Sequence, residues 1–313
     1  MDFPLNYCLI LLIIINEPHA VNLGDKFLAA DAMPLSFQKG VFMCEFCVKH
    51  GEGKKWYEVM EHYSRELYEQ DNRRQFMNKL FSNLQKDVAQ LGKLDRVKKK
   101  MPLAYRFIRH MATRKMKREH FGQVVPVEDA EMIINMVQSI TRIPCVCRGV
   151  TKGNANARYC FALGIDPEGM LGDYPDLKDS LEVLTHQETI KLIQEFDQEG
   201  LIHSIWTFKT PYIGGLCNCD RDCLAYSTQV SSDLMQAMFK AEYVADIDFS
   251  QCVGCRNCQK LCQFGAIEYS SLDKKSLVNV LKCYGCGVCR TACGKEAISL
   301  LDRRSVPEAA GLW

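Results

Sequence analysis

Apolar side chains at helical spacing dominate the first half of the chain. Between residues 56 and 91 they recur every three or four positions with few helix breakers, and residues 127–140 repeat this pattern until Pro144 ends it. Between the two runs, Pro102 should begin a new helix or kink an existing one. The pattern therefore predicts a mainly helical N-terminal region, residues 1–143.

The next segment mixes helical and extended signals. Thr185 and Glu188 form a capping-box pattern before an apolar helical face, and Gly200 marks the end of that helix. Residues 201–208 then predict a strand. Because cysteines are frequent in this part of the chain, we interpret residues 144–243 as a cysteine-rich middle domain.

An apolar run near the N-terminus, residues 8–15, is too short to span a bilayer, which takes about 20 residues. The residues before it include Asp2 and no lysine or arginine, and Glu17 and Pro18 follow where small residues would mark a signal cleavage site. The run therefore predicts a buried strand. It indicates a cytoplasmic protein with no transmembrane segment.

The charges are unevenly distributed, although the net charge is only +1. Residues 96–120 contain ten Lys or Arg and one acid, and Phe107 and Met111 belong to an apolar face at helical spacing. This segment predicts one or two amphipathic basic helices. Their basic face either packs on its own domain or docks an acidic redox partner, because charge patches speed protein encounters. No nucleic-acid-binding motif accompanies it, so no nucleic-acid partner is predicted.

Two runs of four cysteines lie near the end of the chain, each with the spacing C-x2-C-x2-C-x3-C. The second run follows the first at an offset of 31, and seven of the sixteen columns 252–267 are identical at that offset. A repeat of this length marks a duplicated structural unit. The alternatives are paired zinc sites, which usually read C-x2-C, a long gap and C-x2-C, or a disulfide lattice. The runs are Cys252, Cys255, Cys258, Cys262 and Cys283, Cys286, Cys289, Cys293.

This spacing matches the pattern for paired [4Fe–4S] clusters, and residues 247–301 resemble a bacterial-type two-cluster ferredoxin. Three close cysteines surround one cluster, whereas the fourth lies one helical turn further on and ligates the other. The chain departs from the family at Gln263 and Gly294, where a proline usually follows the fourth cysteine; the ligands stay intact. The predicted ligands are Cys252, Cys255, Cys258 and Cys293 for cluster I, and Cys283, Cys286, Cys289 and Cys262 for cluster II.

Nine of the seventeen cysteines lie upstream of these runs. Cys44 and Cys47 form a C-x2-C pair that could join a metal site, and Cys8 fits best as a small core residue. The middle domain holds the other six in short spacings that can place sulfurs on one metal centre, with Arg148 to offset thiolate charge. These six suffice for one additional [4Fe–4S] cluster, and together with Cys44 and Cys47 they make eight thiols, enough for two; a structural zinc or buried reduced thiols are the alternatives. This candidate third site comprises Cys145, Cys147, Cys160, Cys217, Cys219 and Cys223.

The C-x-C-R motif that starts at Cys145, the Gly-Leu-Ile-His step at residues 200–203 and the Cys-Asn-Cys-x3-Cys motif at residues 217–223 precede the two ferredoxin repeats. In this combination, residues 40–300 resemble anaerobe iron–sulfur proteins described as 4Fe–4S dicluster-containing proteins. The resemblance implies the cluster assignment and an electron-transfer role. His203 could be a further ligand, although a lone histidine is more often structural.

We therefore expect an α+β fold, with a mainly helical N-terminal and middle region followed by a (βαβ)2 ferredoxin-like module at residues 244–313. The predicted function is single-electron transfer to a partner oxidoreductase, either a flavoprotein or a larger complex, in an anaerobic cytoplasm. The alternative is a redox enzyme or reductive activator with an open-site cluster in the middle domain. The sequence has no dinucleotide-binding loop, phosphate loop, radical-SAM spacing or zinc-protease motif, and therefore no predicted catalytic residue.

Overall fold

The computed structural model describes residues 43–313 except 71–72, 155, 166–167 and 169–174. All described residues belong to one compact unit. The strand predicted at residues 8–15, which includes Cys8, lies outside them. In the part of the chain that is described, no helix combines the length and apolar character needed to cross a membrane.

Helices make up most of the described chain as far as residue 136. Pro102 begins a helix, as predicted, because the missing N–H of a proline is not needed in the first turn. The helical run predicted between residues 56 and 91 is divided among several elements. In order, these N-terminal elements are α2 (Glu45–His50), η1 (Trp56–Glu58), η2 (Met60–Tyr63), α3 (Arg65–Glu69), α4 (Arg73–Lys100) and α5 (Pro102–Glu119).

The helix predicted at residues 127–140 is shorter than expected. It is α6 (Val127–Met136), after which the backbone becomes extended at Val137, and Ile140–Ile143 forms strand β2. This strand pairs with a neighbour on each side, so ladder hydrogen bonds replace those of another helical turn. Tertiary pairing outweighs helical spacing at the end of this segment.

A seven-stranded sheet runs through the described residues between positions 122 and 239, in the order β4-β2-β3-β6-β5-β1-β7. All neighbours are antiparallel except β1 and β7. The strand predicted at residues 201–208 is confirmed as β5. The strands are β1 (Gly122–Val124), β2 (Ile140–Ile143), β3 (Cys160–Leu163), β4 (Glu182–Val183), β5 (Ile202–Thr207), β6 (Ile213–Cys219) and β7 (Met238–Phe239).

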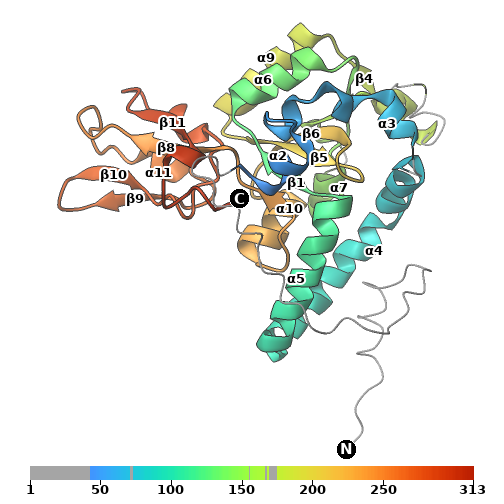
Figure 1. Ribbon diagram of the computed structural model, residues 1–313, viewed down its shortest axis with the longest axis horizontal. Coiled ribbons are helices and arrows are strands. Elements are labelled where there is room, and N and C mark those ends of the chain that lie inside the picture. Colours follow the sequence, from blue (N-terminus) through green and yellow to red (C-terminus); the bar gives the residue numbers. More distant parts are fainter. Residues whose placement is uncertain (1–42, 71–72, 155, 166–167, 169–174) are drawn as a thin grey trace, which may run out of the picture. The chain divides into compact units, whose positions relative to one another are not determined.

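The two faces of the sheet are covered by different elements. Phe161, Ile205 and Leu216 share one face, where they pack with residues of α6 and of α9 (His186–Gln198). These two helices run side by side in Figure 1. Because side chains alternate between faces along a strand, the cysteines of β3 and β6 lie on the opposite face.

The predicted capping box at the start of α9 is confirmed. The Thr185 side chain accepts a hydrogen bond from the backbone of Glu188, and the Glu188 carboxylate accepts one from the backbone of Thr185. Two unsatisfied donors of the first helical turn are thereby paired, which fixes where α9 begins.

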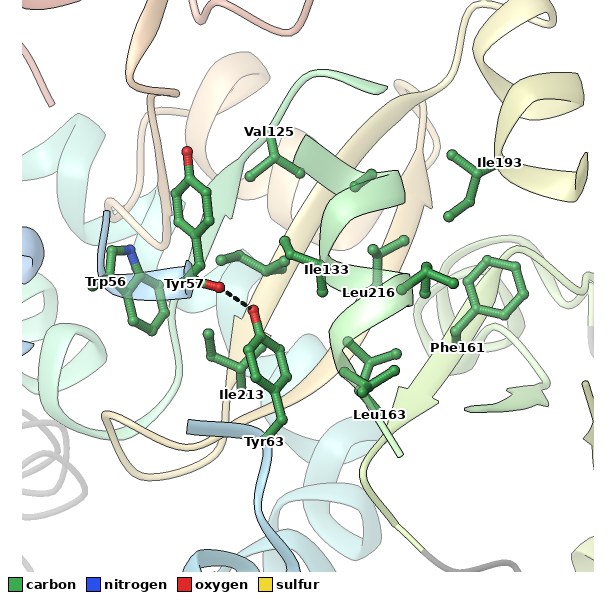
Figure 2. Close-up of a cluster of buried hydrophobic side chains, with 14 of the residues drawn as sticks. Trp56, Tyr57, Tyr63, Val125, Ile133, Phe161, Leu163, Ile193, Ile213 and Leu216 are labelled. Atoms are coloured by element: carbon green, nitrogen blue, oxygen red, sulfur yellow. Dashed lines mark hydrogen bonds between the residues drawn. The ribbon is translucent and has the colours of Figure 1, made fainter. Parts of the chain in front are cut away.

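Large buried side chains join the N-terminal elements to the sheet (Figure 2). Trp56 and Tyr57 of η1 are fully buried, and they belong to the same apolar cluster as Ile133 and Leu216. The Tyr63 hydroxyl donates a hydrogen bond of 2.8 Å to the carbonyl oxygen of Tyr57, drawn as a dashed line in Figure 2. The segment before α4 is therefore part of the core that supports the sheet.

The C-terminal module consists of two small antiparallel sheets. β8 pairs with β11, and β9 pairs with β10, so each sheet takes one strand from each half of the cysteine repeat. The described chain as a whole mixes helices and sheets, as an α+β fold requires. The elements are β8 (Tyr243–Ile247), α11 (Asn257–Leu261), β9 (Ile267–Ser270), β10 (Lys275–Val278), η5 (Val288–Arg290) and β11 (Ile298–Asp302).

Candidate iron–sulfur site

Cavity I, near the start of the C-terminal module, collects thiols from both cysteine runs. Three of its cysteines come from the loop before α11 and from α11 itself, and the fourth comes from the end of the second run. The other lining residues include Ile247 and Ile298, which are paired on β8 and β11. The cysteines that line cavity I are Cys252, Cys255, Cys258 and Cys293.

Cavity II shows the reciprocal arrangement. Three of its cysteines come from the second run, and the fourth is the last cysteine of the first run. The two cavities thus bring together the same two sets of four that the spacing predicts for clusters I and II. All-sulfur sets of this kind suit [4Fe–4S] clusters. The cysteines that line cavity II are Cys262, Cys283, Cys286 and Cys289.

Backbone hydrogen bonds to sulfur repeat at the sequence offset of 31. The N–H of Ala266 donates to Cys262 Sγ at 3.3 Å, and the N–H of Ala297 donates to Cys293 Sγ at 3.4 Å. Cys283 Sγ accepts from the N–H groups of Ala245 and Gly285, both at 3.4 Å. Donors aimed at sulfur favour the thiolate and tune the reduction potential of a bound cluster.

The backbone conformation explains why the repeat has glycine at positions 254 and 285. Gly254 and Gly285 adopt φ values of 68° and 71°, a left-handed conformation that favours glycine. A Cβ on Gly254 would lie 2.0 Å from the carbonyl oxygen of Lys274, and one on Gly285 would lie 2.0 Å from that of Tyr243. Only glycine allows each cysteine loop to approach the neighbouring backbone this closely.

Two of the four cysteines are buried in each cavity, and among all eight only Cys255 in cavity I is exposed. Burial raises the pKa of Cys289 to about 12 and raises that of Cys286 well above its usual value. Near neutral pH these thiols are protonated in the absence of metal, so cluster binding must release protons and weakens as the pH falls.

The six cysteines predicted for a third site also lie close together. We call them the six-thiol group. Cys160 and Cys217 are directly paired across β3 and β6, and Cys217 and Cys219 are two positions apart on one strand, so the three side chains share a face of the sheet. Cys145 and Cys147 come from the start of α7 (Val146–Lys152). The sixth member, Cys223, precedes the short helix α10 (Leu224–Tyr226).

The sulfur atoms of this group form a continuous series of contacts. The Sγ atoms of Cys145 and Cys160 are 3.3 Å apart. Hydrogen bonding to Cys145 lowers the pKa of Cys160, and hydrogen bonding to Cys147 lowers the pKa of Cys223, both well below the usual value for a thiol. The remaining contacts join Cys160 with Cys217, Cys217 with Cys219, Cys219 with Cys223, and Cys223 with Cys147.

Arg148 is buried beside the six-thiol group. Its Nη1 atom lies 3.8 Å from Cys145 Sγ and donates to the carbonyl oxygen of Asn218 at 3.3 Å. Its Nη2 atom forms an ion pair of 2.9 Å with Asp220. The guanidinium is thus held where it can offset the charge of thiolates, as the C-x-C-R motif led us to expect.

His203 has a structural environment. It is fully buried on β5, where Nδ1 lies 2.6 Å from Asn218 Oδ1 and Nε2 lies 3.6 Å from Asp197 Oδ1. These contacts join β5 to β6 and to the end of α9. They make His203 a residue that positions Asn218 between two cysteines.

The six-thiol group is close to cavity II. Ile202 on β5 is directly paired with Cys219 on β6, and it also lines cavity II. The same apolar cluster contains Cys219 and Cys223 from the six-thiol group together with Cys262 and Cys286 from cavity II. The side chain of Ile202 therefore connects Cys219 with the lining of cavity II.

Gln263 ties the loop after Cys262 to the sheet. Its Nε2 atom donates to the carbonyl oxygen of Gly200 at 2.6 Å, and its own carbonyl oxygen accepts from the Tyr226 hydroxyl. A proline, which the ferredoxin resemblance leads one to expect here, has no side-chain donor for Gly200. The departure at position 263 thus contributes to the contact between cavity II and the start of β5.

The C-x2-C pair near the start of the described chain lies beside a carboxylate, whereas the other candidate sites consist of cysteines. Cys44 and Cys47 lie together with Glu242, the residue immediately before β8. The sequence did not single out Glu242, because an isolated acid between apolar residues carries no recognisable spacing. Among the sixteen described cysteines, all are free thiols, so a disulfide lattice is not formed by them.

Comparison with known proteins bears on the C-terminal segment. Residues 245–294 match the model of a family described as a 4Fe-4S dicluster domain, and this stretch contains all eight cysteines of cavities I and II. The match implies [4Fe–4S] clusters and suggests iron–sulfur electron transfer. No curated protein and no solved structure matches the chain.

Proposed function

We propose that this protein is an iron–sulfur electron-transfer protein, or a subunit with that role, which serves a partner oxidoreductase. The supporting observation is the position of Ile202, which contacts cavity II and is paired with Cys219 of the six-thiol group. Two candidate cluster sites with one intervening side chain are suited to pass electrons between them. Bound clusters would supply one-electron chemistry at potentials set by their surroundings.

The C-terminal module would have the (βαβ)2 fold of bacterial ferredoxins. Cluster I would be held by the cysteines of cavity I and cluster II by those of cavity II. The exchange of the fourth cysteine between the runs makes the two clusters neighbours, which supports a relay. Backbone donors such as the N–H groups of Ala266 and Ala297 would stabilise the thiolate ligands.

The six-thiol group would hold a third [4Fe–4S] cluster with four of its six sulfurs. Burial of Cys219 and Cys223 excludes water from this region, and Arg148 offsets the negative charge of the ligands. Because the group offers more thiols than one cluster needs, cysteines alone can ligate all four irons of the cluster. This favours electron transfer over the alternative of an enzyme with an open-site cluster.

The partner would approach the module near cavity I, because Cys255 is exposed there and Val253 beside it is 61% exposed. Helix α5 provides a second surface, where Leu103 and Phe107 are exposed one turn apart and Arg106 lies between them. Such a basic helix suits a partner with an acidic surface and predicts association that slows as salt rises.

Metal content under strictly anoxic conditions tests this proposal. We expect about twelve irons and about twelve sulfides per chain, four of each for every cluster. Replacing Cys160, Cys217 and Cys219 together by serine leaves only three thiols in the six-thiol group, too few for a four-cysteine cluster, and should lower the iron content to about eight while the spectrum of the C-terminal clusters stays unchanged. Counts near eight in the unaltered protein, or zinc in place of the third set of irons, would overturn the three-cluster relay.

A further inference from the structure

Three buried ligand atoms meet between α2 and the start of β8, apart from the cysteines of cavities I and II and of the six-thiol group. Cys44 Sγ lies 3.2 Å from Cys47 Sγ, and Cys47 Sγ lies 3.1 Å from Glu242 Oε1. All three ligand atoms lie within 4.8 Å of one another. The cysteines are 1% exposed and Glu242 is 6% exposed, so this is an interior site.

Segments far apart in the sequence hold these atoms in place. Cys44 caps α2 and accepts a hydrogen bond from the N–H of Cys47 at 3.3 Å, and Cys47 Sγ accepts one from the N–H of Trp56 at 3.4 Å. Glu242 Oε1 accepts from Gln123 Nε2 of β1 at 3.2 Å. The α2 turn, the first strand of the sheet and the start of the C-terminal module thus meet at one point.

Positive charge is available beside Glu242. Arg303 is a buried basic residue that donates its backbone N–H to the carbonyl oxygen of Glu242 at 2.8 Å. Its guanidinium also interacts electrostatically with the Glu242 carboxylate. Two thiolates, one carboxylate and a divalent cation carry a net charge of −1. Arg303 can offset that charge inside the protein.

We propose that Cys44, Cys47 and Glu242 bind one Zn²⁺ ion, with a water molecule in the fourth position. Zinc takes tetrahedral sets of sulfur and carboxylate donors, and Zn–S bonds of about 2.3 Å place two ligand sulfurs about 3.8 Å apart. The two thiols would need to separate only slightly from the distance observed. Binding displaces the two thiol protons to solvent and changes no oxidation state.

The donor set and its burial distinguish zinc from the other uses of a C-x2-C pair. Two sulfurs and one carboxylate are too few thiolates for a [4Fe–4S] cluster held by four cysteines. A redox-active disulfide must be reached by a partner thiol, and Cys44 and Cys47 are buried too deeply for that. The ion would instead fasten α2 to the residue immediately before β8, and so hold the C-terminal module against the sheet.

Zinc analysis of the full chain, purified without oxygen, tests this inference independently of iron. We expect one zinc per chain, and X-ray absorption at the zinc edge should show two sulfur ligands at about 2.3 Å together with oxygen donors. Glu242→Gln should weaken zinc binding by more than the roughly 10–100-fold seen when a residue behind a ligand is changed. Iron content should stay the same.

Glu45→Gln is the matched control, because Glu45 is a carboxylate on α2, next to Cys44, that pairs with Lys49 and Lys117 and not with the two thiols. This variant should retain zinc. If Glu242→Gln does not fold, removal of zinc from the unaltered protein by a chelator, with iron absorbance retained, supports the same site. Three results would overturn it: no zinc in the unaltered protein, a Cys44–Cys47 disulfide in that protein, or loss of iron in Cys44→Ser.

Discussion

The C-terminal module and the six-thiol group gather cysteines in two different ways. In the module, three of the four thiols around each cavity come from one short loop, and the fourth comes from the other half of the repeat. In the six-thiol group, neighbouring sulfurs such as those of Cys160 and Cys217 are far apart in the sequence and meet because β3 pairs with β6. The first arrangement depends mainly on loop geometry, and the second depends on the register of a sheet.

This difference predicts different vulnerabilities. A one-residue shift of β6 against β3 would turn Cys217 and Cys219 to the other face and dismantle the six-thiol group. The same shift would leave the loops of cavities I and II as they are. The module should therefore be sensitive to changes within its loops, and the six-thiol group to changes anywhere in the sheet.

The largest expected effect is that of Cys262→Ala, which tests the exchange of cysteines between the runs. Cys262 belongs to the first run but lines cavity II. We expect loss of about four irons per chain from cluster II, with cluster I retained, measured by anaerobic iron and sulfide counts and by electron paramagnetic resonance. Loss of cluster I in place of cluster II would show that the runs bind separately.

The next effect in size concerns the sheet. Leu216 is fully buried on the face opposite the cysteines, and Leu216→Ala should lower the free energy of unfolding by about 2–5 kcal/mol. We expect iron of the six-thiol group to be lost at a lower urea concentration than iron of the C-terminal clusters. The control Leu272→Ala changes a leucine that is 95% exposed and should alter stability by less than about 0.5 kcal/mol. Simultaneous loss of all iron in Leu216→Ala would contradict the comparison.

The smallest effect is expected for a change in one loop of the module. Gly285→Ala forces a side chain into a left-handed conformation and against the carbonyl oxygen of Tyr243, which should cost at least about 1–3 kcal/mol. Cluster II should become the most easily lost cluster in urea. Gly294→Ala is the matched control, because a Cβ there meets no atom within 4 Å. If both variants lost cluster II at the same urea concentration, the close approach at Gly285 would not contribute to the stability of cluster II.

The C-terminal module and the part of the chain that carries the six-thiol group are not independent, because polar contacts join them. Glu128 on α6 accepts from both Nη atoms of Arg290, at 2.6 and 2.8 Å, and Gln263 bonds to Gly200 at the start of β5. Arg303 of the module donates to the carbonyl oxygen of Ala241, which precedes the module. The module is thus fastened to the sheet and to α6 by several polar contacts.

Local signals in the sequence were enough for several features. The capping box of Thr185 and Glu188 and the helix start at Pro102 were predicted because each depends on residues within one helical turn. The pairing of Gly254 with Gly285 in the repeat also anticipated equivalent loops, and both have the same backbone conformation. Spacing alone identified the segment that matches a 4Fe-4S dicluster domain.

Other features were decided by tertiary structure. β2 replaces the end of a predicted helix because its pairing with β3 and β4 is a long-range interaction that periodicity does not contain. The contacts among the six thiols depend on strand register, and Ile202 between them and cavity II depends on how the module packs. Glu242 joins Cys44 and Cys47 only because β8 begins beside α2. Local geometry follows from neighbouring residues, whereas contacts between distant segments follow from how whole surfaces pack together.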